Sequence, residues 1–215
     1  MYMPSHFEET RPEVIHRLIE DHPLGALVTR GSEGIVANHI PFVIDKAAGE
    51  LGTLIGHVAR NNTLWHDHDE QVDALVIFQG PEAYISPNWY ATKQETHEVV
   101  PTHNYAVAHV YGPLVIHEDA RWLRGAVGRL TKRMEASQER LWKMADAPTS
   151  FLDGQLDHIV GIEIPISRML GKWKTSQNRV RRDREGAIAG LRATGDPADA
   201  AMADLIEERL HSPSS

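Results

Sequence analysis

Residues 24–58 read LGALVTRGSEGIVANHIPFVIDKAAGELGTLIGHV, and this stretch decides the fold class. It contains three apolar runs, at 24–29, 35–44 and 51–58, separated by short turns that contain glycine. Such runs are typical of strands, and connections this short join antiparallel neighbours but cannot hold a crossover helix. The stretch therefore predicts the hairpins of an antiparallel meander.

Helices and further strands are expected on both sides of this meander. Apolar residues recur with the helical period at 14–19, after a Thr10–Glu13 capping-box pattern, and at 122–130. Further helices are expected at 59–69, 186–193 and 197–210, and one or two short helices are expected within 141–156. Further strands are expected at 74–78, 83–85, 102–117 and 159–170. The predicted fold class is α+β, mainly antiparallel β, with a main domain at 1–193 and an acidic helical tail at 194–215.

Composition excludes several classes of protein. The chain has 215 residues, a net charge of −8 and no cysteine, so disulfides, thiolate catalysis and zinc–thiolate or iron–sulfur centres are excluded. The first residues lack the pattern of a signal peptide, and no apolar run approaches the ~18 residues of a membrane span. A cytoplasmic protein without a membrane partner is expected. The acidic balance gives the whole chain no electrostatic attraction to nucleic acid.

The 13 histidines raise the question of a metal site. His66 and His68 on a helix would point about 200° apart, which is a poor arrangement for one metal ion. No HExxH spacing occurs, so no metal site is predicted. Haem ligation by one of the histidines stays open.

The usual sequence signatures of hydrolases and nucleotide-binding proteins do not occur. There is no GxSxG nucleophile elbow, and the serines near histidines have no recognisable acid partner. There is no GxxxxGK[ST] phosphate loop and no strand–GxGxxG–helix unit. A hydrolase, an NTPase and a dinucleotide-binding enzyme are all disfavoured.

A basic cluster lies between residues 168 and 184. It contains seven Lys and Arg residues and one acidic residue, Asp183, so its net charge is 7 − 1 = +6. Three interpretations stay open: a solvated face, a site that holds an anion such as phosphate, and a DNA-contacting segment. No helix-turn-helix pattern supports the third.

Two segments combine aromatic residues with small polar residues and prolines. They are YISPNWY at 84–90 and VVPTHNY at 99–105. Flat aromatic walls beside amide and hydroxyl groups suit a planar heteroaromatic ligand. The alternative is a pair of ordinary loops anchored by aromatic side chains.

These segments belong to a series of motifs that resembles the PaiB family of FMN-binding negative transcriptional regulators. The motifs are MYMP at 1–4 with His6-Phe7, NHIP at 38–41, GHVARNN at 56–62, FQGP at 78–81, YISP at 84–87 with Trp89-Tyr90, VPTHNY at 100–105, and GKWK at 171–174 with SQNR at 176–179. Their order extends over nearly the whole chain. One departure is His103, where the family is expected to have tryptophan.

The resemblance implies a split β-barrel, a homodimer and an FMN site shared across the dimer interface. By analogy, Ala37, Asn38 and His39 lie along the isoalloxazine ring, and His57, Arg60 and Asn61 lie near the phosphate. The other site residues implied by analogy are Tyr84, Ser86, Trp89, Thr102, His103, Asn104, Tyr105, Lys172, Trp173, Lys174, Ser176 and Gln177. For Arg60, the expectation of a helix start at this point adds a physical reason, because free backbone N–H groups favour a phosphate.

The resemblance leaves the biochemical role between three alternatives. A PaiB-type regulator or flavin-linked sensor is expected first, with the basic cluster as the only support for DNA contact. An FMN-dependent oxidoreductase is the second alternative, without any residue that can be named as catalytic. A haem-binding or haem-handling split barrel is the third.

Overall fold

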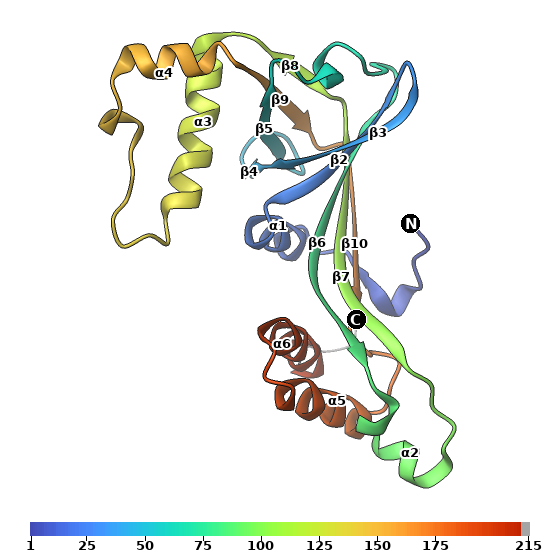
Figure 1. Cartoon of the computed structure of the whole chain (residues 1–215). Helices are drawn as coiled ribbons and strands as arrows, with labels where there is room; N and C mark the ends of the chain where they lie inside the picture. The colour runs from blue at the N-terminus through green and yellow to red at the C-terminus, as the bar shows by residue number, and fades with distance from the viewer. Residues whose placement is uncertain (212–215) are drawn as a thin grey trace. The chain divides into compact units, whose positions relative to one another are not determined.

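The computed structural model describes residues 1–211, and the chain forms two compact units from segments that are distant in sequence (Figure 1). The unit that we call the meander unit consists of 11–78 and 109–169. The terminal unit consists of 1–10, 79–108 and the part of the chain from 170 onward. Strand β6 (Ala74–Ile85) belongs to the meander unit up to residue 78 and to the terminal unit from residue 79. Strand β7 (Thr102–Gly112) belongs to the terminal unit up to residue 108 and to the meander unit from residue 109.

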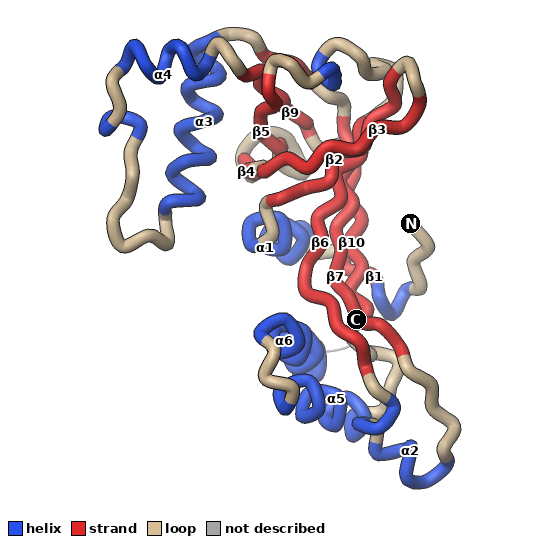
Figure 2. The backbone as a smooth tube through the Cα atoms, in the orientation of Figure 1, coloured by secondary structure: helices blue, strands red, loops and turns tan. Residues whose placement is uncertain are grey.

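The meander unit contains the predicted hairpins. Strands β2 (Leu24–Gly31) and β3 (Gly34–Pro41) pair antiparallel along their whole length, from Leu24↔Pro41 to Gly31↔Gly34, and β2 also pairs with the first part of β6. A second sheet has the order β4-β5-β9-β8 and is antiparallel throughout (Figure 2). Its strands are β4 (Val43–Asp45), β5 (Thr53–Ala59), β8 (Val115–His117) and β9 (Ile159–Pro165).

Helices accompany these sheets. They are α1 (Pro12–Asp21), α3 (Ala120–Glu135) and α4 (Thr149–Leu156), with short 3-10 turns η2 (Thr63–Trp65) and η4 (Met144–Asp146). Helix α1 begins with Pro12 after Arg11, so the predicted capping box at Thr10 is wrong; the fixed φ of proline suits the first helical position and sets the start one residue later. Asp119 caps α3 as its carboxylate accepts from the backbone N–H of Trp122 at 2.8 Å.

The terminal unit is a small sheet with helices against it. Within it, β1 (Glu8–Glu9), β10 (Arg168–Lys174), β7 and β6 are neighbours in that order. The helical elements are η1 (Ser5–Phe7), η3 (Pro87–Trp89), α2 (Ala91–Thr96), α5 (Arg181–Ala193) and α6 (Pro197–His211). Helices α5 and α6 lie side by side (Figure 1).

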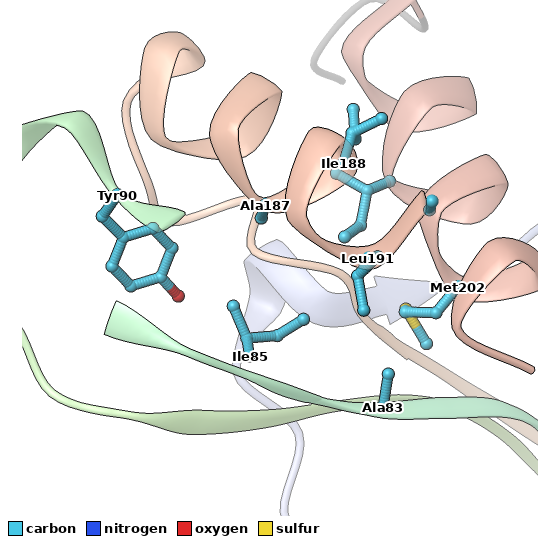
Figure 3. Packing of buried hydrophobic residues seen from close by; sticks show 9 residues of the cluster. Ala83, Ile85, Tyr90, Ala187, Ile188, Leu191 and Met202 are labelled. Atoms are coloured by element: carbon cyan, nitrogen blue, oxygen red, sulfur yellow. The ribbon is translucent and has the colours of Figure 1, made fainter. Parts of the chain in front are cut away.

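Helix α6 is part of the core of the terminal unit. Its Met202 and Ile206 are fully buried in one cluster with Leu191 of α5 and Ile85 of β6. Figure 3 shows Met202 close to Leu191 in this cluster. Burying side chains of this size contributes about 1.5–3 kcal/mol each. The domain boundary expected at 193/194 stays a prediction, and residues 212–215 of the expected tail lie outside the described residues.

Several further expectations about secondary structure are wrong. The helix expected at 59–69 is only the 3-10 turn η2, because the side chains of Asn62 and Asp67 bind backbone N–H groups locally or on the β2–β3 turn. The strands expected at 74–78 and 83–85 are the single strand β6. Strand β2 pairs only with residues 75–77 of β6, so Pro81 lies where β6 has no partner on that side.

The strand expected at 102–117 ends at Gly112, and the chain then enters the other sheet as β8. A Cβ at Gly112 would lie 2.1 Å from the carbonyl oxygen of Pro165, so only glycine permits this close approach. The expected strand at 159–170 likewise ends at Pro165, before β10 begins. With these corrections, the predicted fold class is confirmed: an α+β chain of mainly antiparallel sheets, of the split-barrel type.

The close packing of η3 on α5 predicts that a larger side chain in the contact lowers the free energy of unfolding, and a glycine in α3 provides a control for which the opposite effect is expected. A Cβ at Gly186 would lie 2.0 Å from the backbone oxygen of Trp89, whereas a Cβ at Gly125, inside α3, meets nothing within 4 Å. We expect Gly186→Ala to lower the free energy of unfolding by about 1–3 kcal/mol. Gly125→Ala should raise it by roughly 0.5–1 kcal/mol because alanine has the higher helix propensity. Urea denaturation measures both, and equal effects of the two substitutions would contradict the close packing.

Candidate functional site

The residues that the sequence predicts for the cofactor site fall into two groups, one in each unit. Ala37, Asn38, His39, His57, Arg60 and Asn61 belong to the meander unit. The remaining residues, from Tyr84 to Gln177, belong to the terminal unit. Within each group, the structure shows which side chains come together.

In the meander unit, a hollow of about 310 Å³ lies between β3 and β5. We call it the β3–β5 hollow. It brings together the predicted residues Asn38, His39 and His57, and adds Asn62, which the sequence analysis did not assign. Its other lining residues are Ile40, Pro41, Val58, Ala59 and Ile159. Polar groups on an apolar wall are the usual composition of a small-molecule site.

Asn38 lines this hollow and carries a buried hydrogen-bond donor that has no partner in the described chain. Its side-chain oxygen accepts from the Asn62 amide at 2.8 Å, but its own nitrogen is buried and has no acceptor among residues 1–211. Leaving a buried donor unsatisfied costs about 1–3 kcal/mol. A bound ligand with an acceptor atom at this point would recover that cost.

His57 lies across the hollow on β5 and is half-buried. Burial lowers the pKa of the His57 imidazole, since the charged form loses its hydration there. At neutral pH the ring is therefore uncharged and offers one donor and one acceptor. His39, in contrast, is exposed.

The guanidinium group of Arg60 is already hydrogen-bonded to other residues of the chain. Its Nε donates to the carbonyl of Asp157 at 2.9 Å, one terminal nitrogen contacts the Glu118 carboxylate at 2.7 Å, and the other donates to the carbonyl of Ile159 at 3.2 Å. All three nitrogens thus join the end of β5 to its neighbours. Because no α-helix starts here, the helix-based reason for a phosphate at Arg60 no longer holds, although its expected place in the site stays a prediction.

In the terminal unit, two predicted lysines flank one tyrosine. The Nζ atoms of Lys172 and Lys174 lie 5.3 and 6.0 Å from the centre of the Tyr105 ring. The Lys174 ammonium also donates to the Thr102 hydroxyl and the His103 carbonyl, both at 2.7 Å. Burial, with a contribution from nearby Lys172, lowers the pKa of Lys174. Two ammonium groups this close, on one face of β10, favour an anion.

Several other predicted residues of this unit face one another. The buried Asn104 amide donates to the buried Ser176 hydroxyl at 2.9 Å, and the Gln177 side-chain oxygen accepts from the backbone N–H of Thr175 at 2.7 Å. Trp173 is buried and Trp89 packs over the glycines of α5. Tyr84 is exposed, as is His103, whose ring nitrogen contacts the Glu82 carboxylate. Ser86 caps η3, where its hydroxyl accepts from the N–H of Asn88 at 3.2 Å.

The basic cluster is not one continuous cationic surface. Arg182 forms a bidentate pair with Glu95, both contacts at 2.6 Å, and Arg181 pairs with Glu185 at 2.7 Å. Arg184 donates to the carbonyl of Ile206 at 3.3 Å, and Arg179 lies over the Tyr90 ring. These contacts use charges that would otherwise be available to phosphate groups of DNA.

A family model described as "Putative FMN-binding domain" matches residues 1–168. The chain belongs to this family. The sporulation-associated relative "Protease synthase and sporulation protein PAI 2" of Bacillus subtilis is 31% identical over 217 residues, 98% of each chain, which confirms the resemblance to PaiB. An uncharacterized protein of Emericella nidulans is 34% identical over 244 residues, 97% of each chain. FMN is thereby confirmed as the cofactor predicted for this family.

Solved structures with the same fold include proteins that carry flavin or haem. The flavocytochrome Anf3 from Azotobacter vinelandii matches with a TM-score of 0.60 and 10% identity, covering 86% of this chain and 78% of that one. An FAD- and haem-binding protein from Mycobacterium smegmatis matches with a TM-score of 0.53 and 16% identity, covering 78% and 73%. At this identity the likeness concerns the fold. Among residues 1–211, no helix is long and apolar enough to cross a membrane.

The pKa of His57 predicts a pH dependence of stability. Below about pH 6.5, His57 binds a proton in the unfolded chain but not in the folded chain, where its pKa is lower. The free energy of unfolding therefore decreases as the pH falls from 6.5 through the lowered pKa. The slope for one proton is at most about 1.4 kcal/mol per pH unit. His57→Gln should make the decline of unfolding free energy in this window shallower. Parallel pH profiles for the two proteins would contradict the assignment.

Proposed function

We propose that the β3–β5 hollow binds the isoalloxazine ring of FMN. The observation that carries this proposal is the buried, unpartnered amide nitrogen of Asn38 beside the uncharged His57. The isoalloxazine ring is planar and bears carbonyl oxygens and unprotonated ring nitrogens, which accept hydrogen bonds. When bound, FMN supplies the redox chemistry itself.

The residues of the hollow have distinct parts in this proposal. Asn38 donates to an acceptor on the ring, and His57 donates or accepts without adding a charge. Ile40, Val58 and Ile159 cover apolar ring surface and exclude water. No residue of the hollow must act as an acid or a base for such binding.

Within the terminal unit, considered by itself, we propose that Lys172 and Lys174 form a site for an anion such as a phosphate group. Their ammonium groups share one strand face, and the lowered pKa of Lys174 indicates that this charge is poorly hydrated. A dianionic phosphate would compensate for both charges. Of the other predicted residues of the terminal unit, Thr102 and His103 accept hydrogen bonds from Lys174, and Tyr105 lies beside both lysines.

We also propose that the protein is a homodimer. Strand β3 is the last strand of its sheet, and its apolar residues Ile35 and Val36 are 81% and 44% exposed. Exposed apolar edge strands are liabilities that proteins normally cover. A second copy of the chain is the occupant that the family resemblance implies.

As a biological role, we propose a PaiB-type regulator or flavin-linked sensor in the cytoplasm. The similarity to the sporulation-associated Bacillus protein supports a regulatory role. The internal pairing of Arg181, Arg182 and Arg184 favours regulation without direct contact of this cluster with DNA. An FMN-dependent oxidoreductase is the alternative, tested by turnover of NAD(P)H in the presence of FMN.

Titration with FMN and riboflavin tests the binding proposal. The wild-type protein should bind both, with FMN bound more tightly because of its phosphate. Asn38→Leu should weaken both ligands about tenfold, the equivalent of one lost hydrogen bond. Flavin fluorescence measures all of these, and a wild-type protein that binds neither ligand overturns the proposal.

Light scattering after size-exclusion chromatography tests the dimer. The wild-type protein should have twice the mass of one chain at micromolar concentration. Ile35→Lys should shift the equilibrium toward the monomer by at least tenfold, since it places a charge in the apolar contact. Gln71→Glu, an exposed charge change in the same unit, serves as the control and should leave the mass unchanged. A wild-type monomer at high concentration refutes the dimer.

A further inference from the structure

The turn after β5 contains a residue whose orientation can be deduced from a backbone group. The side-chain oxygen of Asn62 accepts a hydrogen bond from the backbone N–H of Leu64 at 2.9 Å, which caps η2. A backbone N–H can only donate, so the atom that faces it must be the oxygen. The amide nitrogen of Asn62 therefore has to point the other way.

That nitrogen faces Asn38 and dictates the orientation of its side chain in turn. The Asn62 amide lies 2.8 Å from the Asn38 carboxamide, and because it is a donor, Asn38 must present its oxygen to it. The Asn38 nitrogen is then directed away from Asn62. This assignment follows from the Leu64 N–H alone, which removes the usual ambiguity between the oxygen and nitrogen of an amide.

The Asn38 side chain therefore has its amide nitrogen, a donor, as the group without a partner in the described chain, and not its oxygen, an acceptor. The Asn38 nitrogen is buried and has no acceptor among residues 1–211, although Asn38, Asn62 and His57 all line the same hollow. A freely rotating Asn38 would present its oxygen to the hollow in half of its orientations. The bond from Asn62 excludes that orientation.

We propose that Asn62 is the positioning residue of the site: it holds the Asn38 carboxamide so that the hollow offers a hydrogen-bond donor, selecting ligands with an acceptor at this point. In this proposal Asn62 acts on the ligand through Asn38. The inference rests on the proposed function, with FMN as the ligand. It also predicts that the polarity of the hydrogen bond can be inverted by one substitution.

Asn62→Asp is the substitution that separates the two roles of this residue. An aspartate oxygen still accepts from the Leu64 N–H, so the cap is kept. Its other oxygen now faces Asn38, which must turn its amide nitrogen toward it and its oxygen toward the ligand. We expect FMN and riboflavin to bind at least tenfold more weakly, with a changed visible absorption band of the bound flavin and an unchanged melting temperature.

A double-substitution cycle shows whether the effect passes through Asn38. In the Asn38→Leu background, Asn62→Asp should weaken FMN no further, since there is no carboxamide left to turn. Gln71→Glu adds the same charge at an exposed turn of the same unit and should leave FMN affinity unchanged. Asn62→Ser, which keeps a capping oxygen but is too short to reach Asn38, should weaken FMN less than Asn62→Asp does.

The outcomes distinguish this inference from the proposed function. A wild-type protein that binds FMN while Asn62→Asp binds it equally well overturns the inference alone. Additive effects of Asn38→Leu and Asn62→Asp also overturn it, because they would show that Asn62 acts on the ligand by another route. A wild-type protein that does not bind FMN overturns both. If Asn62→Asp does not fold, the cycle is run with Asn62→Ser, and additivity there has the same meaning.

Discussion

The register of the β2–β3 hairpin is the constraint on which the site depends. Leu27 lies opposite Asn38, and a shift by one residue would move Asn38 to the other face of the sheet and bring Ala37 or His39 inward. The loop that follows β5 secures this hairpin at two places. Asn62 binds Asn38 at one end, and Asp67 accepts from the backbone N–H of Ser32 at the turn, at 2.8 Å. That hydrogen bond, from Ser32, is the main reason that the pKa of Asp67 is lowered.

The distribution of charge explains why a strongly basic segment does not imply a basic surface. Residues 168–184 carry a local balance of +6, but their side chains leave the backbone in different directions. On strand β10, Lys172 and Lys174 lie on one face over Tyr105. On helix α5, Arg181 and Arg182 find carboxylates at Glu185 and Glu95. The two lysines thus lie beside an aromatic ring and polar groups, whereas the two arginines face carboxylates.

Sequence reasoning located the elements well and the side-chain networks poorly. The spacing of apolar runs predicted the hairpin because alternation and turn length are local properties. The expected helix at 59–69 failed because Asn62 and Asp67 satisfy backbone N–H groups in a non-helical loop, which helix propensity does not report. Separate strands were expected at 74–78 and 83–85, but β6 continues between them, beyond the residues that pair with β2. Asn62 stood inside a quoted motif but had no assigned part, since its partner is 24 residues away.

By itself, the sequence determined the absence of cysteine chemistry, the antiparallel fold class, the family and hence FMN as the cofactor. These depend on composition, on periodicity within single segments and on motifs in a fixed order. Only the tertiary structure decided which of the predicted residues face a ligand and which face one another. The amide nitrogen of Asn38 has no hydrogen-bond partner within residues 1–211, whereas the Asn104 amide donates to the Ser176 hydroxyl. All three nitrogens of the Arg60 guanidinium donate to neighbouring carbonyl and carboxylate groups. The physical reason is that a hydrogen-bonding group is available to a ligand only when nothing else in the fold satisfies it, and those competitors come from distant parts of the chain.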